Sequence, residues 1–492
     1  MNHENNEENN EEQSLQGPEN ADLEKQLTET SKLNKDVNPK FLLKFALPTI
    51  LSMIIMSTMG IIDGVFISRL IDESAFAAVS IAMPFLMFAL AIGFMLGVGG
   101  NAIVAKILGE GNVARARNIF SFITLTAFIV SIIMTSTGIF FPSLVLDILG
   151  ADVLGDQVLE YLRPIIFALP IVVGSVIFQQ FLMTEGKAHI STISFLISGV
   201  INIGLNFLLV GHFDMGLQGA AIATSVGYSL PAVIGLVYFL RNKKGKLYFV
   251  KPTFDAKVLI DSAINGSSEF ITMMAASIVS AITNRILMDM GETFPIIPGY
   301  EYFNTGSLYV ATVGVSFALM GILSSIFIGY ASGILPIISF NFGKGDHGRL
   351  KSTFKISVFV IVASSLLSIG LAFIFSSPLV RIYFNNTDQY TLYAMTIETF
   401  RIVSLSFVFM GINAFGSMFF TALSNGKLSA LIAVSRTFIF AIIALFTLPA
   451  IFETLGMQRQ FGVYAAMPAA EVATIFVTVI LFKIMAKRYK YA

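Results

Sequence analysis

The sequence predicts an all-α polytopic membrane protein with twelve transmembrane helices, arranged as two parallel repeats of six. Three observations predict this fold: the composition, the number of long apolar runs, and a set of motifs that occurs twice in the same order. Hydrophobic residues make up 55% of the 492 residues and charged residues only 13%, whereas about 25% is charged in a typical soluble domain. Mean hydropathy is +0.78, so most of the chain suits lipid better than water.

The composition also excludes several classes of site. The formal net charge is zero, which gives no electrostatic reason to bind nucleic acid. Cysteine is absent and only four histidines occur, so we expect no disulfide, no thiolate chemistry, no metal centre and no cofactor. Residues 1–38 are rich in Asn and Glu and carry no cleavable signal, which predicts a disordered cytoplasmic tail.

Apolar runs of about 20 residues are long enough to cross the hydrocarbon core of a bilayer. In this chain they are separated by Gly, Pro and clusters of charge, which mark the loops. The twelve predicted spans are 41–68, 76–106, 119–145, 157–184, 189–210, 217–240, 259–290, 306–333, 353–378, 392–423, 429–451 and 461–485.

Basic residues are concentrated in the loops on one side of these spans. The opposite loops hold Arg69, Arg381 and Arg459, and the longest of them, 291–306, holds no Lys or Arg. Because cytoplasmic loops carry the excess of Lys and Arg, both termini are predicted to be cytoplasmic, in a multi-pass protein of the cell membrane. The basic residues of the cytoplasmic side are Arg115, Arg117, Lys187, Arg241, Lys243, Lys244, Lys246, Lys251, Lys257, Lys344, Arg349, Lys351, Lys355, Lys427, Lys483, Lys487, Arg488 and Lys490.

The second half of the chain repeats the first. Gly109 and Arg115 match Gly343 and Arg349, each 234 residues further on, and later motifs match at offsets that increase steadily to 246. Six spans per repeat is an even number, so both repeats enter the membrane in the same direction, related by a pseudo-twofold axis along its normal. The predicted domains are an N-lobe (39–240), a basic cytoplasmic linker (241–258), a C-lobe (259–486) and a short cytoplasmic tail (487–492).

Two lobes with a cleft between them suit alternating access, in which the lobes rock around a central site. The loops GEGN and GKGD contain glycines but have neither a preceding strand nor a Walker lysine, so we expect no nucleotide site. Transport then has to draw on an ion gradient.

At this point the motifs resemble a known family. The D-G-V-F sequence at 63–66, the glycine- and arginine-containing loops after spans 2 and 8, and Asn202 and Asn206 four residues apart resemble the multidrug and toxic compound extrusion (MATE) family. The resemblance covers about residues 40–485 and is greater to the DinF-like prokaryotic branch than to the NorM-like one. It implies an efflux antiporter for organic, often cationic, compounds, driven by H⁺ or Na⁺.

Asp63 is the most informative residue of the first span. It lies about 9 Å below the end marked by Arg69, and the six-residue separation turns their side chains to different faces of the helix. A charge at that depth costs about 2.5–3.5 kcal/mol or more, which points to a function. The resemblance implies a cation site made by Asp63, Asn202 and Thr224, with Asn206 standing where many members have Asp.

The identity of the coupling ion stays open between H⁺ and Na⁺. Because Asn206 replaces a second acid, the cluster carries one formal charge instead of two, which favours H⁺ over Na⁺. The alternative is that Asn202 and Asn206 only bond one helix to another, as amides often do in membranes.

The C-lobe contains three more interior charges. Glu269 lies about 18 Å along its helix from Lys257 and is a candidate counter-ion for a substrate, with a structural role as the alternative. Arg436 and Glu471 reach mid-depth from opposite ends of their spans, so we expect a structural salt bridge between them. Forty-six Phe and twenty-one Met, without Trp, favour an adaptable apolar interior. The candidate substrate-lining residues are Glu269, Met273, Met274, Phe317, Met320, Phe407 and Met410.

The preferred function is secondary antiport of small organic cations or amphiphiles by a monomer in the lipid bilayer. A flippase for lipid-linked precursors or polysaccharides is the first alternative, but the interior charges are mainly acidic and disfavour an anionic pyrophosphate cargo. A membrane-embedded transferase is the second. It needs clustered His, Asp or Cys at a membrane face, and the sequence has no such cluster, so we expect the protein not to be an enzyme.

Overall fold

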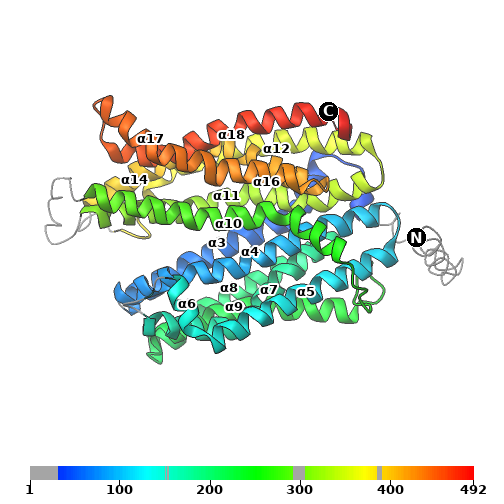
Figure 1. The fold of residues 1–492 in the computed structure, drawn as a ribbon, viewed down its shortest axis with the longest axis horizontal. Coiled ribbons are helices and arrows are strands. Elements are labelled where there is room, and N and C mark those ends of the chain that lie inside the picture. The colour runs from blue at the N-terminus through cyan, green and yellow to red at the C-terminus, as the bar shows by residue number, and fades with distance from the viewer. Residues whose placement is uncertain are drawn as a thin grey trace, which may run out of the picture.

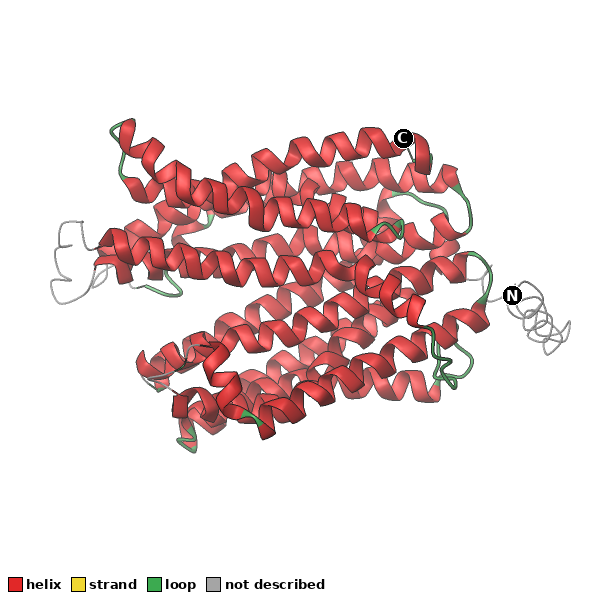
Figure 2. Cartoon of the chain, viewed as in Figure 1, coloured by secondary structure: helices red, strands yellow, loops and turns green. Residues whose placement is uncertain are grey.

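The computed structural model describes residues 32–71, 73–149, 151, 155–291, 305–384 and 390–491, and helices make up all the regular structure in these ranges (Figure 2). Eleven of the described helices are long and apolar enough to cross a membrane, and the bent pair α14 and α15 makes a twelfth span if it is counted as one. The predicted tail as far as residue 31, most of the loop 291–306 and the side chain of Arg69 lie outside what the structure describes.

The chain divides into a first half, α3 to α9, and a second half, α10 to α18, which lie one above the other in Figure 1. The first half, after the short turn η1 (Lys32–Asn34), contains α3 (Pro39–Leu70), α4 (Glu73–Gly109), α5 (Val113–Phe140), α6 (Pro142–Leu149), α7 (Gly155–Thr184), α8 (Ala188–Leu205), η2 (Asn206–His212) and α9 (Gly216–Arg241). The second half contains α10 (Ala256–Gly291), α11 (Thr305–Gly343), α12 (His347–Ile374), α13 (Ser376–Val380), α14 (Tyr390–Ser404), α15 (Phe407–Ala422), α16 (Gly426–Val434), η3 (Ser435–Ile439), α17 (Phe440–Thr454) and α18 (Arg459–Tyr489).

The observed spans differ from the predicted ones in two places. The span predicted at 119–145 begins earlier, at Val113, because the helix continues beyond its apolar part, and ends at Phe140, ahead of Pro142. Proline disfavours a helical conformation in the residue before it, so α6 is a separate short helix. The span predicted at 392–423 bends by 48° between α14 and α15.

The loops after the second span of each half have the same construction. Gly111 has a φ of 89° and Gly345 a φ of 73°, in the left-handed region that glycine enters without strain. One residue later, the side chains of Asn112 and Asp346 cap the following helices, each accepting a backbone N–H three residues on, at 2.9 and 3.0 Å. The repeated glycines of the sequence therefore make equivalent turns into α5 and α12.

The two halves contact each other closely through glycines. Helix α4 packs against α10 and α11, and α3 packs against α11 (Figure 1). A Cβ on Gly109 would overlap the carbonyl oxygen of Phe340, and a Cβ on Gly343 would overlap that of Lys106. Both members of the first pair are 234 residues from their counterparts in the second pair, so this backbone contact is made twice, once by each repeat.

The segment before α3 belongs to the first half in sequence but binds the second half. Arg349 donates to the carbonyl oxygen of Asn34 at 2.7 Å and to its Oδ1 at 2.8 Å, and pairs with Asp36 at 3.1 Å. Lys344 donates to the same Oδ1 at 2.8 Å, and Leu33 is fully buried. Residues 32–36, which we call the N-terminal strap, are therefore packed, although the sequence placed them in the disordered tail.

The linker between the halves, residues 242–255, is bound to the first half. Arg117 donates to the carbonyl oxygen of Lys246 at 2.9 Å, and the Glu185 carboxylate accepts the backbone N–H groups of Lys246 and Leu247, both at 3.1 Å. Glu185 lies in the loop between α7 and α8, and its burial raises the pKa of its carboxyl, an effect that nearby Lys246 reduces. The linker is thus a docked segment that follows the surface of the first half.

Candidate ion and substrate sites

Three helices of the first half converge on the carboxylate of Asp63. The side chain is buried in α3, with 8% of its surface exposed. Its Oδ1 accepts a hydrogen bond from Asn206 Nδ2 at 2.7 Å, and its Oδ2 accepts one from Thr224 Oγ1 at 2.9 Å. The structure therefore brings together Asp63, Asn206 and Thr224, which are up to 161 residues apart in the chain.

The local backbone is irregular where Asn206 reaches the carboxylate. Asn206 begins η2, a π-helical segment, and its Nδ2 also donates to the carbonyl oxygen of Asn202 at 3.2 Å. In a regular helix that carbonyl is paired with the backbone N–H of Asn206. On the facing helix α9, a Cβ on Gly227 would lie 3.0 Å from Met59 Cε and 3.4 Å from Asn202 Cβ, so glycine allows α9 to approach α3 and α8 closely.

The cluster has polar atoms without partners in the described part of the chain. Asn202 is completely buried beside the Asp63 carboxylate, yet neither Oδ1 nor Nδ2 of its side chain is hydrogen-bonded there, and Asn206 Oδ1 also lacks a partner. Buried polar atoms are nearly always paired. One carboxylate with two unpaired amide oxygens around it is chemically suited to a small cation.

Two tyrosines complete this environment, and the sequence gave no indication of them. Tyr161 of α7 lies against the Thr224 hydroxyl, and both Tyr161 and Tyr228 of α9 are within electrostatic reach of the Asp63 carboxylate. Tyr161 belongs to the E-Y-L-R motif, in which only the flanking charges drew attention. Its helical position relative to Asp63 depends on how α7 packs against α9, which no local pattern reports.

A second buried polar cluster lies in the second half. Arg436, in the π-helical segment η3, forms an ion pair with Glu471 of α18 at 3.8 Å. Asn413 of α15 donates to the other carboxylate oxygen of Glu471 at 2.7 Å, and Thr478 donates to Asn413 Oδ1 at 2.8 Å. Helices α15, η3 and α18 are thereby joined through polar side chains within an otherwise apolar bundle.

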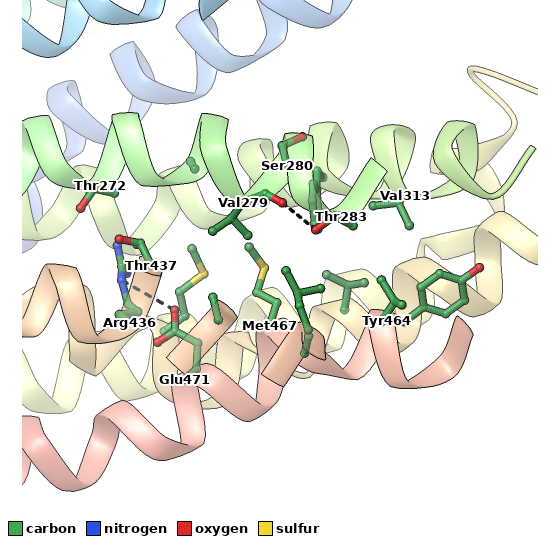
Figure 3. Close-up of a pocket in the computed structure, with 18 residues that line it drawn as sticks. Thr272, Val279, Ser280, Thr283, Val313, Arg436, Thr437, Tyr464, Met467 and Glu471 are labelled. Carbon is green, nitrogen blue, oxygen red and sulfur yellow. Dashed lines mark hydrogen bonds and ion pairs between the residues drawn. The ribbon is translucent and has the colours of Figure 1, made fainter. Parts of the chain in front are cut away.

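This cluster closes one end of a cavity of about 250 Å³. Figure 3 shows Arg436 and Glu471 at that end, Tyr464 at the other, and Val279 and Met467 between them. All the residues that line it come from the second half, whereas the sequence placed the substrate site between the lobes. The number of residues along a helix predicts depth in the membrane but not which neighbour a side chain faces.

Only part of the predicted lining is found around this cavity. Phe317 and Met410 line it, together with Thr272 and Met467. The other five predicted residues, Glu269, Met273, Met274, Met320 and Phe407, are not among its lining residues. Phe407 and Met320 are buried in the core, and Glu269 is partly buried on α10, one helical turn before Thr272, with Arg436 as its electrostatic partner.

With both sites described, the comparisons with known proteins become informative. The MatE family model matches residues 48–208 and 301–447, more than half of the chain. The chain belongs to the MatE family. Among its relatives, the multidrug export protein MepA of Staphylococcus saprophyticus is 24% identical over 437 residues, covering 88% of this chain and 90% of the relative. MepA of Staphylococcus aureus is 23% identical over 437 residues, covering 87% and 92%.

Solved structures of MATE transporters have the same fold. One described as the outward-facing conformation of a multidrug resistance MATE family transporter aligns with a TM-score of 0.82 at 16% identity, over 94% of this chain and 98% of that one. Another, a transporter from Pyrococcus furiosus described as having reverse polarity of its binding pocket, aligns with a TM-score of 0.82 at 16% identity, over 95% and 99%. The predicted fold class and family are thereby confirmed.

Members of the MATE family are transporters, so the prediction that the chain is not an enzyme is also confirmed. Within the described residues of this MATE protein, His, Asp and Glu do not gather in groups of three that could hold a metal ion. The polar chemistry of its interior is instead divided between the Asp63 cluster and the Arg436–Glu471 cluster, one in each half.

Proposed function

We propose that this MATE protein exports small amphipathic organic compounds from the cell by antiport, with Asp63 as the residue that binds and releases the coupling cation. The observation that carries the proposal is the buried Asp63 carboxylate, held by Asn206 and Thr224 next to unpaired amide oxygens. The multidrug export of the MepA relatives supports the choice of cargo. Both termini face the cytoplasm in this proposal, as the basic loops predict.

Binding of a cation to Asp63 neutralises the only carboxylate of its cluster. A charge change inside the first half alters the relative free energies of the inward-facing and outward-facing arrangements of the two halves. Antiport follows when the ion and the organic substrate favour opposite arrangements. Each ligand can shift the equilibrium only by its difference in affinity for the two states, so both sites need to change shape during transport.

The geometry of Asn206 supports H⁺ as the coupling ion. Its Nδ2, not its Oδ1, faces the Asp63 carboxylate, at 2.7 Å. Coordination of Na⁺ requires the amide to turn so that Oδ1 faces the ion, whereas a proton needs only the carboxylate itself. The single formal charge of the cluster also attracts Na⁺ less than the two acids do that many relatives carry.

Efflux of a fluorescent organic cation from proteoliposomes, with H⁺ and Na⁺ gradients imposed separately, tests this function. Wild-type protein is expected to export the dye with a pH gradient, and Asp63→Asn is expected to reduce efflux to the level of protein-free vesicles while keeping the protein folded and inserted. Asp289→Asn, which alters an exposed carboxylate of α10, is the matched control. Wild-type efflux by Asp63→Asn would exclude the role of Asp63, and efflux with Na⁺ at clamped pH would exclude proton coupling.

A further inference from the structure

The polar end of the cavity in the second half presents an unused hydrogen-bond donor. The Arg436 side chain is 8% exposed, and its Nη1 is buried without an acceptor among the described residues. Its Nε faces Glu471 Oε1 at 3.8 Å, beyond ordinary hydrogen-bonding distance. A guanidinium has five N–H donors and no acceptor, so this residue is able to bind a further acceptor group.

The partner of Arg436 has no comparable capacity. Glu471 uses one carboxylate oxygen for Arg436 and the other for Asn413 Nδ2 at 2.7 Å, and Asn413 is fixed in turn by Thr478. The charge of this pair is balanced and the carboxylate is already held. What the Arg436–Glu471 cluster offers to a molecule in the cavity is therefore a donor on a cation, and not a free carboxylate.

A free acid is nevertheless close by. Glu269 of α10 is one helical turn from Thr272, which lines the cavity, and its nearest opposite charge is Arg436, outside ion-pair distance. Among the described residues Glu269 has no ion pair of its own. The end of the cavity thus combines a guanidinium N–H with a carboxylate a short distance away, while the remaining walls, including Val279, Phe317 and Met467, are mainly apolar.

We propose that this cavity selects amphipathic zwitterions, with Arg436 binding the anionic or hydrogen-bond-accepting group of the substrate and Glu269 facing its cationic group. The inference rests on the proposed export function and specifies its substrate class, because composition and family resemblance alone indicated organic cations. Its volume, about 250 Å³, is slightly below that of pockets that enclose a whole drug-sized ligand. It therefore receives the charged end of the substrate, and Arg436 is a specificity-determining residue.

A pair of dyes with one skeleton provides the test. Rhodamine B is a zwitterion at neutral pH, and its ethyl ester is a monocation of nearly the same size. Export of both from proteoliposomes gives a ratio of zwitterion to monocation transport that cancels differences in protein amount. We expect wild type to prefer rhodamine B and Arg436→Gln to lower this ratio about tenfold, the effect of one charge-assisted hydrogen bond. Arg436→Lys, which keeps the positive charge, should restore part of it.

The controls separate selectivity from folding. Arg285→Gln removes an arginine from an exposed ion pair of the same half and should leave the ratio unchanged. Arg436→Gln combined with Glu471→Gln keeps the cluster uncharged and should show the same lowered ratio. If Arg436→Gln does not fold, binding of the two dyes to purified wild type by fluorescence anisotropy decides the question, and equal affinities overturn the inference.

The failure of the inference differs from the failure of the proposed function. Transport of both dyes by wild type, with a ratio that Arg436→Gln leaves unchanged or with equal losses for the two dyes, overturns the zwitterion preference and leaves export standing. Absence of transport of either dye under every imposed gradient overturns the export function, and the substrate assignment with it.

Discussion

Asn206 connects the backbone irregularity of η2 to the chemistry of Asp63, because one amide nitrogen donates both to the carboxylate and to the Asn202 carbonyl. An amide at this position holds the acid in place without adding charge. A carboxylate would accept hydrogen bonds but donate none when ionised. The choice of Asn or Asp at residue 206 therefore determines how many charges the ion site presents.

Asn206→Asp is expected to shift coupling from H⁺ towards Na⁺. Two carboxylates near each other attract a metal cation more strongly than one does, and they supply oxygens where the wild type supplies an N–H. Dye efflux driven by a Na⁺ gradient at clamped pH should increase in this variant. Asn206→Leu is the control that removes the amide without adding charge. A Na⁺ response that stays at the wild-type level in Asn206→Asp would contradict the role of residue 206.

The residue scale also shows where sequence-based inference ends. Asp63, Asn202, Asn206 and Thr224 were predicted as one group, because depth is readable from helix length and the order of these types resembles a family pattern. Tyr161, Tyr228 and the unpaired Nη1 of Arg436 were not predicted. Their contribution depends on the rotation of each helix about its axis, which is fixed by packing against neighbouring helices.

At the scale of elements, helix ends and interruptions follow local rules to different degrees. The caps of α5 and α12 and the break before Pro142 follow from residue type. The π-helical segments η2 and η3 and the 48° bend between α14 and α15 have no comparable local signal. They result from side chains such as Asn206 that compete for backbone acceptors.

The docked linker predicts a pH dependence of stability. The folded-state pKa of Glu185 is raised, so the folded protein binds this proton more tightly than the unfolded chain does. The contribution of Glu185 to stability is therefore fully present below the ordinary glutamate pKa of about 4.3 and is lost as pH rises through the raised folded-state value. Glu185→Gln is expected to weaken this decline, and the difference in melting temperature between variant and wild type should move in favour of the variant as pH rises.

Thermal unfolding in detergent at a series of pH values measures this effect. Glu110→Gln, at the end of the loop after α4, is the control for removing a carboxylate from the same side of the molecule. Parallel pH profiles of wild type and Glu185→Gln would show that Glu185 does not control the docking of the linker.

At the scale of the whole molecule, each half holds the segment that leads into the other half or comes from it. The N-terminal strap precedes α3 but is bound by Lys344 and Arg349, and the linker precedes α10 but is bound by Arg117 and Glu185. The glycine contacts of Gly109 and Gly343 lie on the same side of the molecule. The two halves are thus joined at this end by backbone packing and by crossed attachments.

Arg349→Ala is expected to release the N-terminal strap. The substitution removes two hydrogen bonds to Asn34 and the ion pair with Asp36. Since the chain has no native cysteine, Leu33→Cys provides a single thiol at a fully buried position. Its labelling by a maleimide should be about tenfold faster or more in the Arg349→Ala background, because charged hydrogen bonds contribute more than the 1.4 kcal/mol that corresponds to a tenfold change.

Arg381→Ala, which removes an exposed arginine elsewhere in the second half, is the control for this measurement. Slow labelling of Leu33→Cys that persists in Arg349→Ala would mean that burial of the apolar side chain alone holds the strap. Fast labelling in an otherwise unchanged chain would mean that the strap does not stay bound.

The strap also joins residues that are made at different times. Asn34 leaves the ribosome 315 residues before Arg349, an interval of roughly 15–60 s at ~5–20 residues per second. During that interval the first half is complete and its linker can dock, since Arg117, Glu185 and Lys246 are synthesised within 130 residues of one another. The strap finds its binding residues only after α11 has been made. Biogenesis of this face is therefore ordered: the linker docks first, and the oldest described residues of the nascent chain are among the last to be fixed.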